Sequence, residues 1–222
     1  MNKNKTLLYG GKSTGLIVYE MLKEKNKKIS FIFDEFINKP HFRHNAKFSN
    51  KKKDLKNFIK GSDYFVTCIG SEYGKARYLI SKELEKKKLK PLKIISKHSY
   101  ISDINLIGEG AQVLPSAVIH HKAKIGDYCI LNTGSIVEHD CKVGHGVHIM
   151  PGVVIGGNTH IGNYVTVGLN ATVMPQLKIG EGAFIGAGAV VTKNVKKNEI
   201  VIGNPAKFFK LMKHKVDLNI FK

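Results

Sequence analysis

The stretch that decides the fold runs from residue 101 to residue 191, and its middle, residues 129–149, reads CILNTGSIVEHDCKVGHGVHI. Every sixth residue of this stretch is Ile, Leu or Val. These residues are Ile101, Ile107, Val113, Ile119, Ile125, Leu131, Val137, Val143, Ile149, Ile155, Ile161, Val167, Val173, Ile179, Ile185 and Val191. A period of six fits neither the 3.6-residue turn of a helix nor a long strand. It predicts short strands that turn a corner after each step, as in a β-solenoid.

A second set of residues, four positions after the first, is mostly small or β-branched and suits the tight corners. Its members are Ala111, Ala117, Ala123, Cys129, Ser135, Cys141, Val147, Val153, Thr159, Val165, Ala171, Ala183 and Ala189. Three six-residue sides give a triangular coil of eighteen residues, so residues 101–191 predict about five coils. The register is unbroken, and we therefore expect no long loop to leave the solenoid.

Composition limits the class of protein. The chain has 222 residues, 42% of them hydrophobic, and no apolar run near the ~20 residues of a membrane span. The start, Met-Asn-Lys-Asn-Lys, does not resemble a signal peptide. Cys68, Cys129 and Cys141 lack metal-site spacing, and we expect core thiols in a reducing cytoplasm.

The net charge of +19 has two interpretations. It indicates either an anionic partner (nucleic acid, a membrane surface or phosphorylated small molecules) or simply solvated, lysine-rich faces. No stripe of alternating aromatic and basic residues of the kind used to bind single strands is present, so no nucleic-acid partner is expected.

Residues 1–97 predict a small α/β domain with a Rossmann-like parallel sheet, because expected strands alternate with expected helices. The expected strands are residues 6–9, 29–33, 64–69 and 93–95, and the expected helices are residues 16–22 and 72–88.

A glycine-rich loop, residues 10–15, joins the first strand to the first helix. Free backbone amides at such a place favour phosphate binding, although a plain tight turn has the same composition. The loop lacks the dinucleotide fingerprint, because Lys12 stands where its second glycine should be, and Thr6 replaces the first glycine of a Walker A loop. Asp34 and Glu35 follow the second strand, where open α/β sheets bind ligands; a solvated loop is the alternative.

Polar residues within the solenoid repeat mark candidate chemistry. His139 comes two positions after an inward aliphatic residue, which places it at a corner, and Asp140 follows it directly. A carboxylate can fix the tautomer of a neighbouring imidazole and stabilise its charged form, so this pair is a candidate general base. We expect His120, His145 and His160 to be surface residues.

The unbroken hexapeptide array, the α/β domain before it, the run Glu138-His139-Asp140-Cys141 and the ending Val201-Ile202-Gly203-Asn204-Pro205-Ala206-Lys207 together resemble one family. It is the bacterial nucleotide-aminosugar N-acetyltransferases, which are related to sialic acid O-acetyltransferases. The resemblance covers residues 7–207. It implies a left-handed parallel β-helix over residues 98–207, a nucleotide-sugar-binding domain over residues 1–97, a homotrimer, and a role in polysaccharide or glycan biosynthesis.

The resemblance also implies roles for individual residues. His139 would take a proton from the C4 amine of the sugar as that amine attacks acetyl-CoA, and Asp140 would orient His139. The acetyl-CoA site would include His148, the backbone N–H of Gly157, Leu169, Ala187 and Lys207. No metal is required. The sugar nucleotide would be bound by Gly10, Gly11, Lys12, Ser13, Thr14, Asp34 and Glu35.

One departure from the family concerns the phosphates. Close relatives commonly have Gly-His where this chain has Ser13-Thr14, and Lys12 is the candidate for supplying the missing positive charge. Three alternatives stay open at this point: O-acetylation of a sialic acid or another sugar hydroxyl, a γ-class carbonic anhydrase, which needs three zinc-bound histidines that the spacing here does not offer, and a non-catalytic trimeric scaffold.

The tail, residues 208–222, alternates Phe208, Leu211 and Met212 with lysines that include Lys213 and Lys215. This amphipathic pattern predicts a short helix that packs on the last coil.

Overall fold

The computed structural model describes residues 4–213, 216 and 218–221 and divides the chain into two compact units. The first unit comprises residues 1–69, 79–94 and 216–222, and the second comprises residues 70–78 and 95–215. Residues 70–78 therefore group with the solenoid although they precede the end of the α/β domain in the sequence.

The first unit contains a parallel five-stranded sheet in the order β3-β2-β1-β4-β5. Its strands are β1 (Thr6–Tyr9), β2 (Ile29–Phe33), β3 (Lys47–Ser49), β4 (Tyr64–Thr67) and β5 (Lys90–Pro91). The helices of this part of the chain are α1 (Ser13–Glu24), α2 (Lys52–Lys60) and α3 (Gly74–Lys86), and the 3₁₀ turn η2 (Asn219–Phe221) follows near the end. The predicted α/β class is confirmed.

Three elements of this unit did not emerge from the sequence: β3, α2 and β5. The helix α2 buries only Leu55 and Phe58, and its other positions are mostly lysine, so its apolar face is two residues wide. The strands β3 and β5 are three and two residues long, too short for an alternating pattern to register.

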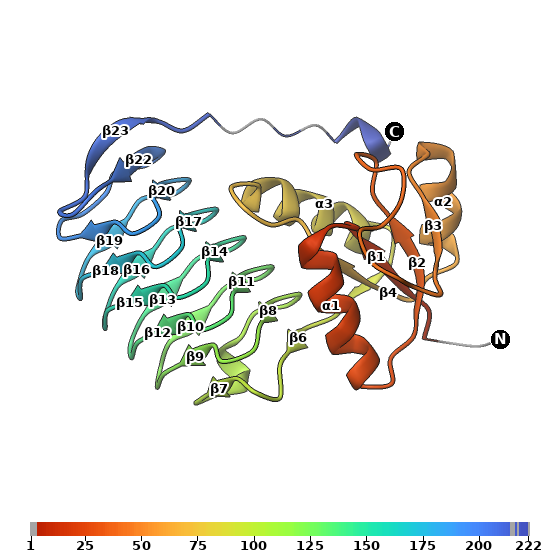
Figure 1. The fold of residues 1–222 in the computed structure, drawn as a ribbon, viewed down its shortest axis with the longest axis horizontal. Helices are drawn as coiled ribbons and strands as arrows, with labels where there is room; N and C mark the ends of the chain where they lie inside the picture. Colours follow the sequence, from red (N-terminus) through yellow and green to blue (C-terminus); the bar gives the residue numbers. More distant parts are fainter. Residues whose placement is uncertain (1–3, 214–215, 217, 222) are drawn as a thin grey trace. The chain divides into compact units, whose positions relative to one another are not determined.

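The second unit is a left-handed parallel β-helix, as predicted (Figure 1). Its strands are β7 (Tyr100–Ile101), β8 (Gln112–Val113), β9 (Val118–Ile119), β10 (Lys124–Ile125), β11 (Ile130–Leu131), β12 (Ile136–Val137), β13 (Lys142–Val143), β14 (His148–Ile149), β15 (Val154–Ile155), β16 (His160–Ile161), β17 (Thr166–Val167), β18 (Thr172–Val173), β19 (Lys178–Ile179), β20 (Phe184–Ile185), β21 (Val190–Val191), β22 (Glu199–Ile202) and β23 (Lys207–Leu211). The short strand β6 (Ile94–Ile95) precedes them, and the 3₁₀ turn η1 (Ile104–Leu106) follows β7.

The coils stack in a register of eighteen residues, as the hexapeptide period requires. Ile130 pairs with His148, and His148 pairs with Thr166, in one face; Val137 pairs with Ile155 in another. Each coil has three sides. The strands on the same side of successive coils pair with one another, so the solenoid contains three sheets.

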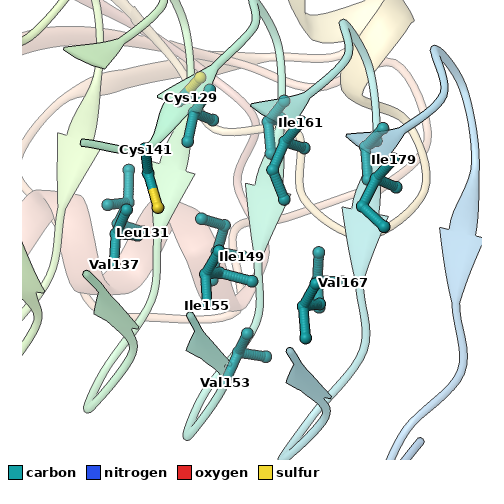
Figure 2. Packing of buried hydrophobic residues seen from close by; sticks show 14 of the residues in the cluster. Cys129, Leu131, Val137, Cys141, Ile149, Val153, Ile155, Ile161, Val167 and Ile179 are labelled. Atoms are coloured by element: carbon teal, nitrogen blue, oxygen red, sulfur yellow. The ribbon is translucent and has the colours of Figure 1, made fainter. Parts of the chain in front are cut away.

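The core lies inside this triangle and consists of both predicted residue sets. Every sixth residue from Ile107 to Val191 is at most 5% exposed. Leu131, Ile149 and Val167 lie on successive coils in Figure 2. Each packs next to the residue eighteen positions earlier in the sequence. Burying such columns of aliphatic side chains stabilises the solenoid without any long-range loop.

The predicted helix in residues 208–222 is wrong. Residues 207–211 form β23, which pairs antiparallel with β22. The last parallel strand leaves an open edge, and the adjacent aromatic residues Phe208 and Phe209 favour the extended backbone that pairs with it. Lys215 and the other residues of the tail at 214, 217 and 222 lie outside the described residues.

Candidate acetyl-transfer site

His139 and Asp140 occupy the turn between β12 and β13. The imidazole Nδ1 and Asp140 Oδ2 are 2.9 Å apart, and the two side chains are 61% and 46% exposed. Asp140 has a φ of +59°, a left-handed conformation that Asp tolerates better than most residues. Backbone bonds fix this turn on both sides: the N–H of Asp140 donates to the carbonyl of His121, and the N–H of Asn158 donates to the carbonyl of His139.

The ionic state of the pair follows from this geometry. The hydrogen bond from His139, together with Lys122 nearby, lowers the pKa of Asp140 below its ordinary value. The carboxylate therefore accepts, Nδ1–H donates, and Nε2 is the ring nitrogen left free to act as a base. The predicted pair is thus in the geometry that a general base requires.

Gly157 lies against this basic nitrogen, one coil after His139. A Cβ placed on Gly157 would lie 2.7 Å from Nε2 and 2.8 Å from Cε1 of His139. Both distances are shorter than a van der Waals contact. Glycine at this position therefore keeps the space in front of the imidazole clear.

The backbone N–H of Gly157 makes no hydrogen bond with another described residue. The equivalent amides on another edge of the triangle are closed by a ladder of side chains. There Glu109 N–H donates to Asp127 Oδ1, Asp127 N–H to His145 Nδ1, and His145 N–H to Asn163 Oδ1, each at 2.9 Å. The edge that contains His139 and Gly157 has no such ladder among the described residues, so an amide donor stays available beside the imidazole.

Leu169 and Ala187 also lie at corner positions, eighteen residues apart, so they stack on the same edge of the solenoid. Both are exposed, and the Leu169 carbonyl accepts from the N–H of Gly188 at 2.8 Å. This edge differs from the edge of His139 and Gly157. The exposed Lys207 lies in β23.

His148 is buried rather than exposed to a groove, with 5% of its surface accessible. Burial, and secondly the charge of Arg77, lower its pKa to about 3, so it is neutral at physiological pH. Its Nδ1 donates to the Ser71 carbonyl at 3.2 Å, and Asn132 Nδ2 lies 3.4 Å from its Nε2. The tautomer of His148 is thereby fixed.

Arg77 supports the segment that carries Ser71. Its side chain has no exposed surface and donates to the carbonyls of Tyr128 at 2.7 Å, Gly146 at 2.9 Å and Val147 at 3.1 Å. Sequence reasoning missed both Arg77 and Asn132. The rarity of arginine was a usable signal for the first, whereas nothing in the repeat distinguishes Asn132 from an ordinary turn residue.

The glycine loop of the first unit is a separate group of predicted residues. Gly10 has a φ of +116°, and a Cβ there would lie 2.7 Å from the Cys68 carbonyl oxygen, so only glycine fits. The N–H of Gly10 donates to the Phe33 carbonyl, and the N–H of Gly11 donates to Asp34 Oδ2. Within the described part of the chain, the backbone N–H groups of Lys12, Ser13 and Thr14, at the start of the twelve-residue helix α1, make no hydrogen bond. A helix start of this kind suits an anion.

Asp34 is buried and faces the loop backbone. Its Oδ2 accepts from Gly11 N–H at 2.9 Å and its Oδ1 from Phe36 N–H at 3.0 Å. Asp34 therefore fixes the shape of the glycine loop. Glu35 is exposed beside it. Burial and the nearby Glu35 and Asp34 raise the pKa of the Tyr9 hydroxyl, which therefore stays protonated.

No group of three His, Cys, Asp or Glu side chains in the described part of the chain is arranged to bind a metal ion. None of the helices in the described residues has both the length and the apolar character to cross a membrane.

The fold and the repeats define a class of protein. Residues 106–139, 134–169 and 158–193 match the model of the bacterial transferase hexapeptide family (six repeats). The repeats of this solenoid are therefore similar to those of bacterial hexapeptide transferases.

Three solved structures extend the likeness to the whole chain. WeeI from Acinetobacter baumannii AYE is 28% identical, with a TM-score of 0.79 over 92% of this chain and 99% of that one. The acetyltransferase domain of PglB from Neisseria gonorrhoeae FA1090 is 25% identical, with a TM-score of 0.80 over 93% and 100%. A mutant perosamine N-acetyltransferase from Caulobacter crescentus, in complex with CoA and GDP-perosamine, is 23% identical, with a TM-score of 0.81 over 93% and 97%, and shows the shared fold. The predicted resemblance to bacterial sugar acyltransferases is confirmed.

Proposed function

We propose that this protein is an acetyl-CoA-dependent acetyltransferase that acetylates the C4 amino group of a nucleotide-linked 4-amino-4,6-dideoxy sugar. One observation carries the proposal: a hydrogen-bonded His139–Asp140 pair lies at a corner of a hexapeptide solenoid, with the open face of Gly157 against its basic nitrogen. Similar structures contain CoA and GDP-perosamine or acetyl coenzyme A.

The chemistry needs one base and one oxyanion donor. The amine nitrogen attacks the thioester carbon while Nε2 of His139 takes a proton from it. Negative charge builds on the thioester oxygen, and the N–H of Gly157 donates to it there. The C–S bond then breaks, the CoA sulfur takes the proton from the imidazolium, and the products are an acetamide and free CoA thiol. Because both substrates are bound before reaction, much of the rate gain comes from their orientation.

The other predicted residues take supporting roles in this proposal. Neutral His148 lies near the acetyl group, and Leu169, Ala187 and Lys207 follow the CoA arm. In the first unit Lys12, Ser13 and Thr14 bind the diphosphate, Gly10, Gly11 and Asp34 shape the loop, and Glu35 reaches the nucleoside.

We also propose a homotrimer with sites between neighbouring solenoids. Its support is a set of large apolar side chains that stay 43–61% exposed on the second unit: Leu169, Met174, Ile202, Phe208, Phe209 and Leu211. Such a set is typical of a surface that a further subunit covers. Light scattering on the purified protein measures the mass directly, and a monomer at micromolar concentration would contradict this part.

The test of the function is thiol release from acetyl-CoA with a panel of UDP-, GDP- and dTDP-linked 4-amino-4,6-dideoxy sugars. Turnover with one of them, reduced by about 10²–10⁴ in His139→Ala, supports the proposal. Asp140→Asn should keep substrate binding and lose rate. Turnover only with a hydroxyl sugar such as sialic acid would instead assign O-acetylation. Equal turnover in His139→Ala would remove His139 as the base.

A further inference from the structure

Arginine is rare in this chain. Of its 36 basic residues, two are arginine, Arg43 and Arg77, and the rest are lysine. The guanidinium group differs from an ammonium group because its planar fork binds two acceptors at once and stays charged when buried. Arg77 uses this fork on three backbone carbonyls.

Arg43 lines an open hollow of about 590 Å³ on the first unit. Helix α1 contributes Tyr19 and Lys23, and the connection between β2 and β3 contributes the remaining lining, which is Lys39, Pro40, Phe42, Arg43, His44 and Asn45.

The charges around the hollow are of one sign. Lys23, Lys39 and Arg43 are cationic, and neither Asp nor Glu is among its described lining residues. Within residues 4–213, 216 and 218–221, none of these three side chains has a hydrogen bond or an ion pair. Three uncompensated cations around one concave surface raise the local concentration of anions.

Aromatic and hydrogen-bonded groups give the hollow a defined shape. The rings of Tyr19 and Phe42 pack at 5.2 Å, and the Tyr19 hydroxyl accepts from the N–H of Asn45 at 3.3 Å. His44 Nδ1 donates to the Ala46 carbonyl at 3.0 Å, which fixes the orientation of the ring.

The hollow is distinct from the glycine loop, although the same connection packs on both. The N–H of His41 donates to the Gly11 carbonyl at 3.0 Å, and Phe42 lies 3.6 Å from the position of a Cβ on Gly15. None of the predicted substrate-binding residues lines the hollow. We propose that it is a second anion site, which binds a phosphate-bearing ligand through Arg43 with Lys23 and Lys39.

The experiment is calorimetric titration of the full-length protein with inorganic pyrophosphate at low salt, and flotation with phosphatidylcholine vesicles that contain phosphatidic acid. Pyrophosphate represents a free phosphorylated ligand, and the vesicles represent a lipid headgroup. The variants are Arg43→Gln, the matched control Lys28→Gln, which removes an exposed charge outside the hollow, and Lys12→Gln in the glycine loop.

The site is supported if Arg43→Gln weakens binding of either probe by about 10- to 100-fold while Lys28→Gln changes it less than about twofold, because bonds to a charged group are worth that much. The probe that binds names the source of the phosphate. No binding of either probe, or equal losses in Arg43→Gln and Lys28→Gln, overturns the proposal.

Failure here is distinguishable from failure of the proposed function. If pyrophosphate binding is lost in Lys12→Gln but kept in Arg43→Gln, the glycine loop is the phosphate site and the second site does not exist. Acetyl transfer by Arg43→Gln without added pyrophosphate should stay within about twofold of the unmodified protein, because Arg43 contacts none of the reacting groups.

Discussion

The space in front of His139 Nε2 offers the sharpest test of the candidate site. Gly157→Ala adds a methyl group whose carbon would lie 2.7 Å from Nε2 and 2.8 Å from Cε1. Carbon and nitrogen atoms approach to roughly 3.5 Å, so the imidazole must move by about 0.8 Å. The backbone does not resist the substitution, because Gly157 is absent from the residues with a left-handed φ.

The imidazole, and not the core, is expected to move. The His139 side chain is 61% exposed, so it can turn away without disturbing the solenoid, and its bond to Asp140 is the contact at risk. A misplacement near 1 Å of a reacting group can cost about 10²-fold in rate. We therefore expect kcat to fall roughly 30- to 100-fold, with small changes in substrate KM and in the urea midpoint of unfolding.

A double-mutant cycle measures whether the loss acts through the imidazole. The assay is thiol release with the best sugar nucleotide of the panel, for Gly157→Ala, His139→Ala and the combined variant. If the methyl group acts on the ring, it has little further effect once the ring is gone, and the two losses are far from additive. Additive losses, or an unimpaired Gly157→Ala, would refute the reasoning.

Three further predictions concern the buried framework. Burial lowers the pKa of His148 to about 3, so the unfolded state binds this proton at a higher pH than the folded state does. The free energy of unfolding should therefore fall as the pH drops from about 6.5 toward 3. Urea unfolding of His148→Gln at several pH values should lack this part of the pH dependence. Arg77→Met removes the donor of the Tyr128 and Gly146 carbonyls, while the Val147 carbonyl keeps the N–H of Ile130. The change should cost about 2–6 kcal/mol in the free energy of unfolding, and a loss under 1 kcal/mol would contradict the assignment of those bonds. Ile149→Ala should cost about 2–5 kcal/mol by the same measurement, since Ile149 has no exposed surface inside the column of aliphatic residues; an unchanged midpoint would show that this column contributes little.

The solenoid was predictable because its physics is periodic. Each coil of eighteen residues repeats the same pattern, an aliphatic residue that points inward and a small residue at the corner. The pattern therefore recurs in every coil and is easily detected in the sequence. The α/β unit has no such repetition. Its helix α2 shows two buried residues in a lysine-rich segment. At the end of the solenoid the repeat also stops, and there β23 replaced the predicted helix because pairing with β22 decided its conformation.

The residues of the candidate site also differ in how far the sequence predicts them. The period places His139 at a corner and Asp140 beside it, so their pairing followed from the sequence. The role of Asp34 did not, because the bond from the Gly11 N–H depends on how a loop folds back over a strand end. The burial of His148 also depends on residues 70–78, which lie far away in the sequence and supply the carbonyl of Ser71.

The edges of the solenoid differ in how their corner amides are bonded. Where Asp127, His145 and Asn163 stand at the corner, each side chain satisfies the amide of the coil before it, and the edge is closed. On the edge of Gly157 the residue one coil later is Pro175, whose side chain has no acceptor, so the N–H of Gly157 makes no hydrogen bond with another described residue. In the proposed reaction the missing side chain of Gly157 leaves space in front of the imidazole, and the unbonded N–H of Gly157 donates to the developing oxyanion. The repeat supplies the rigid spacing between these groups, which is what orientation of two substrates requires.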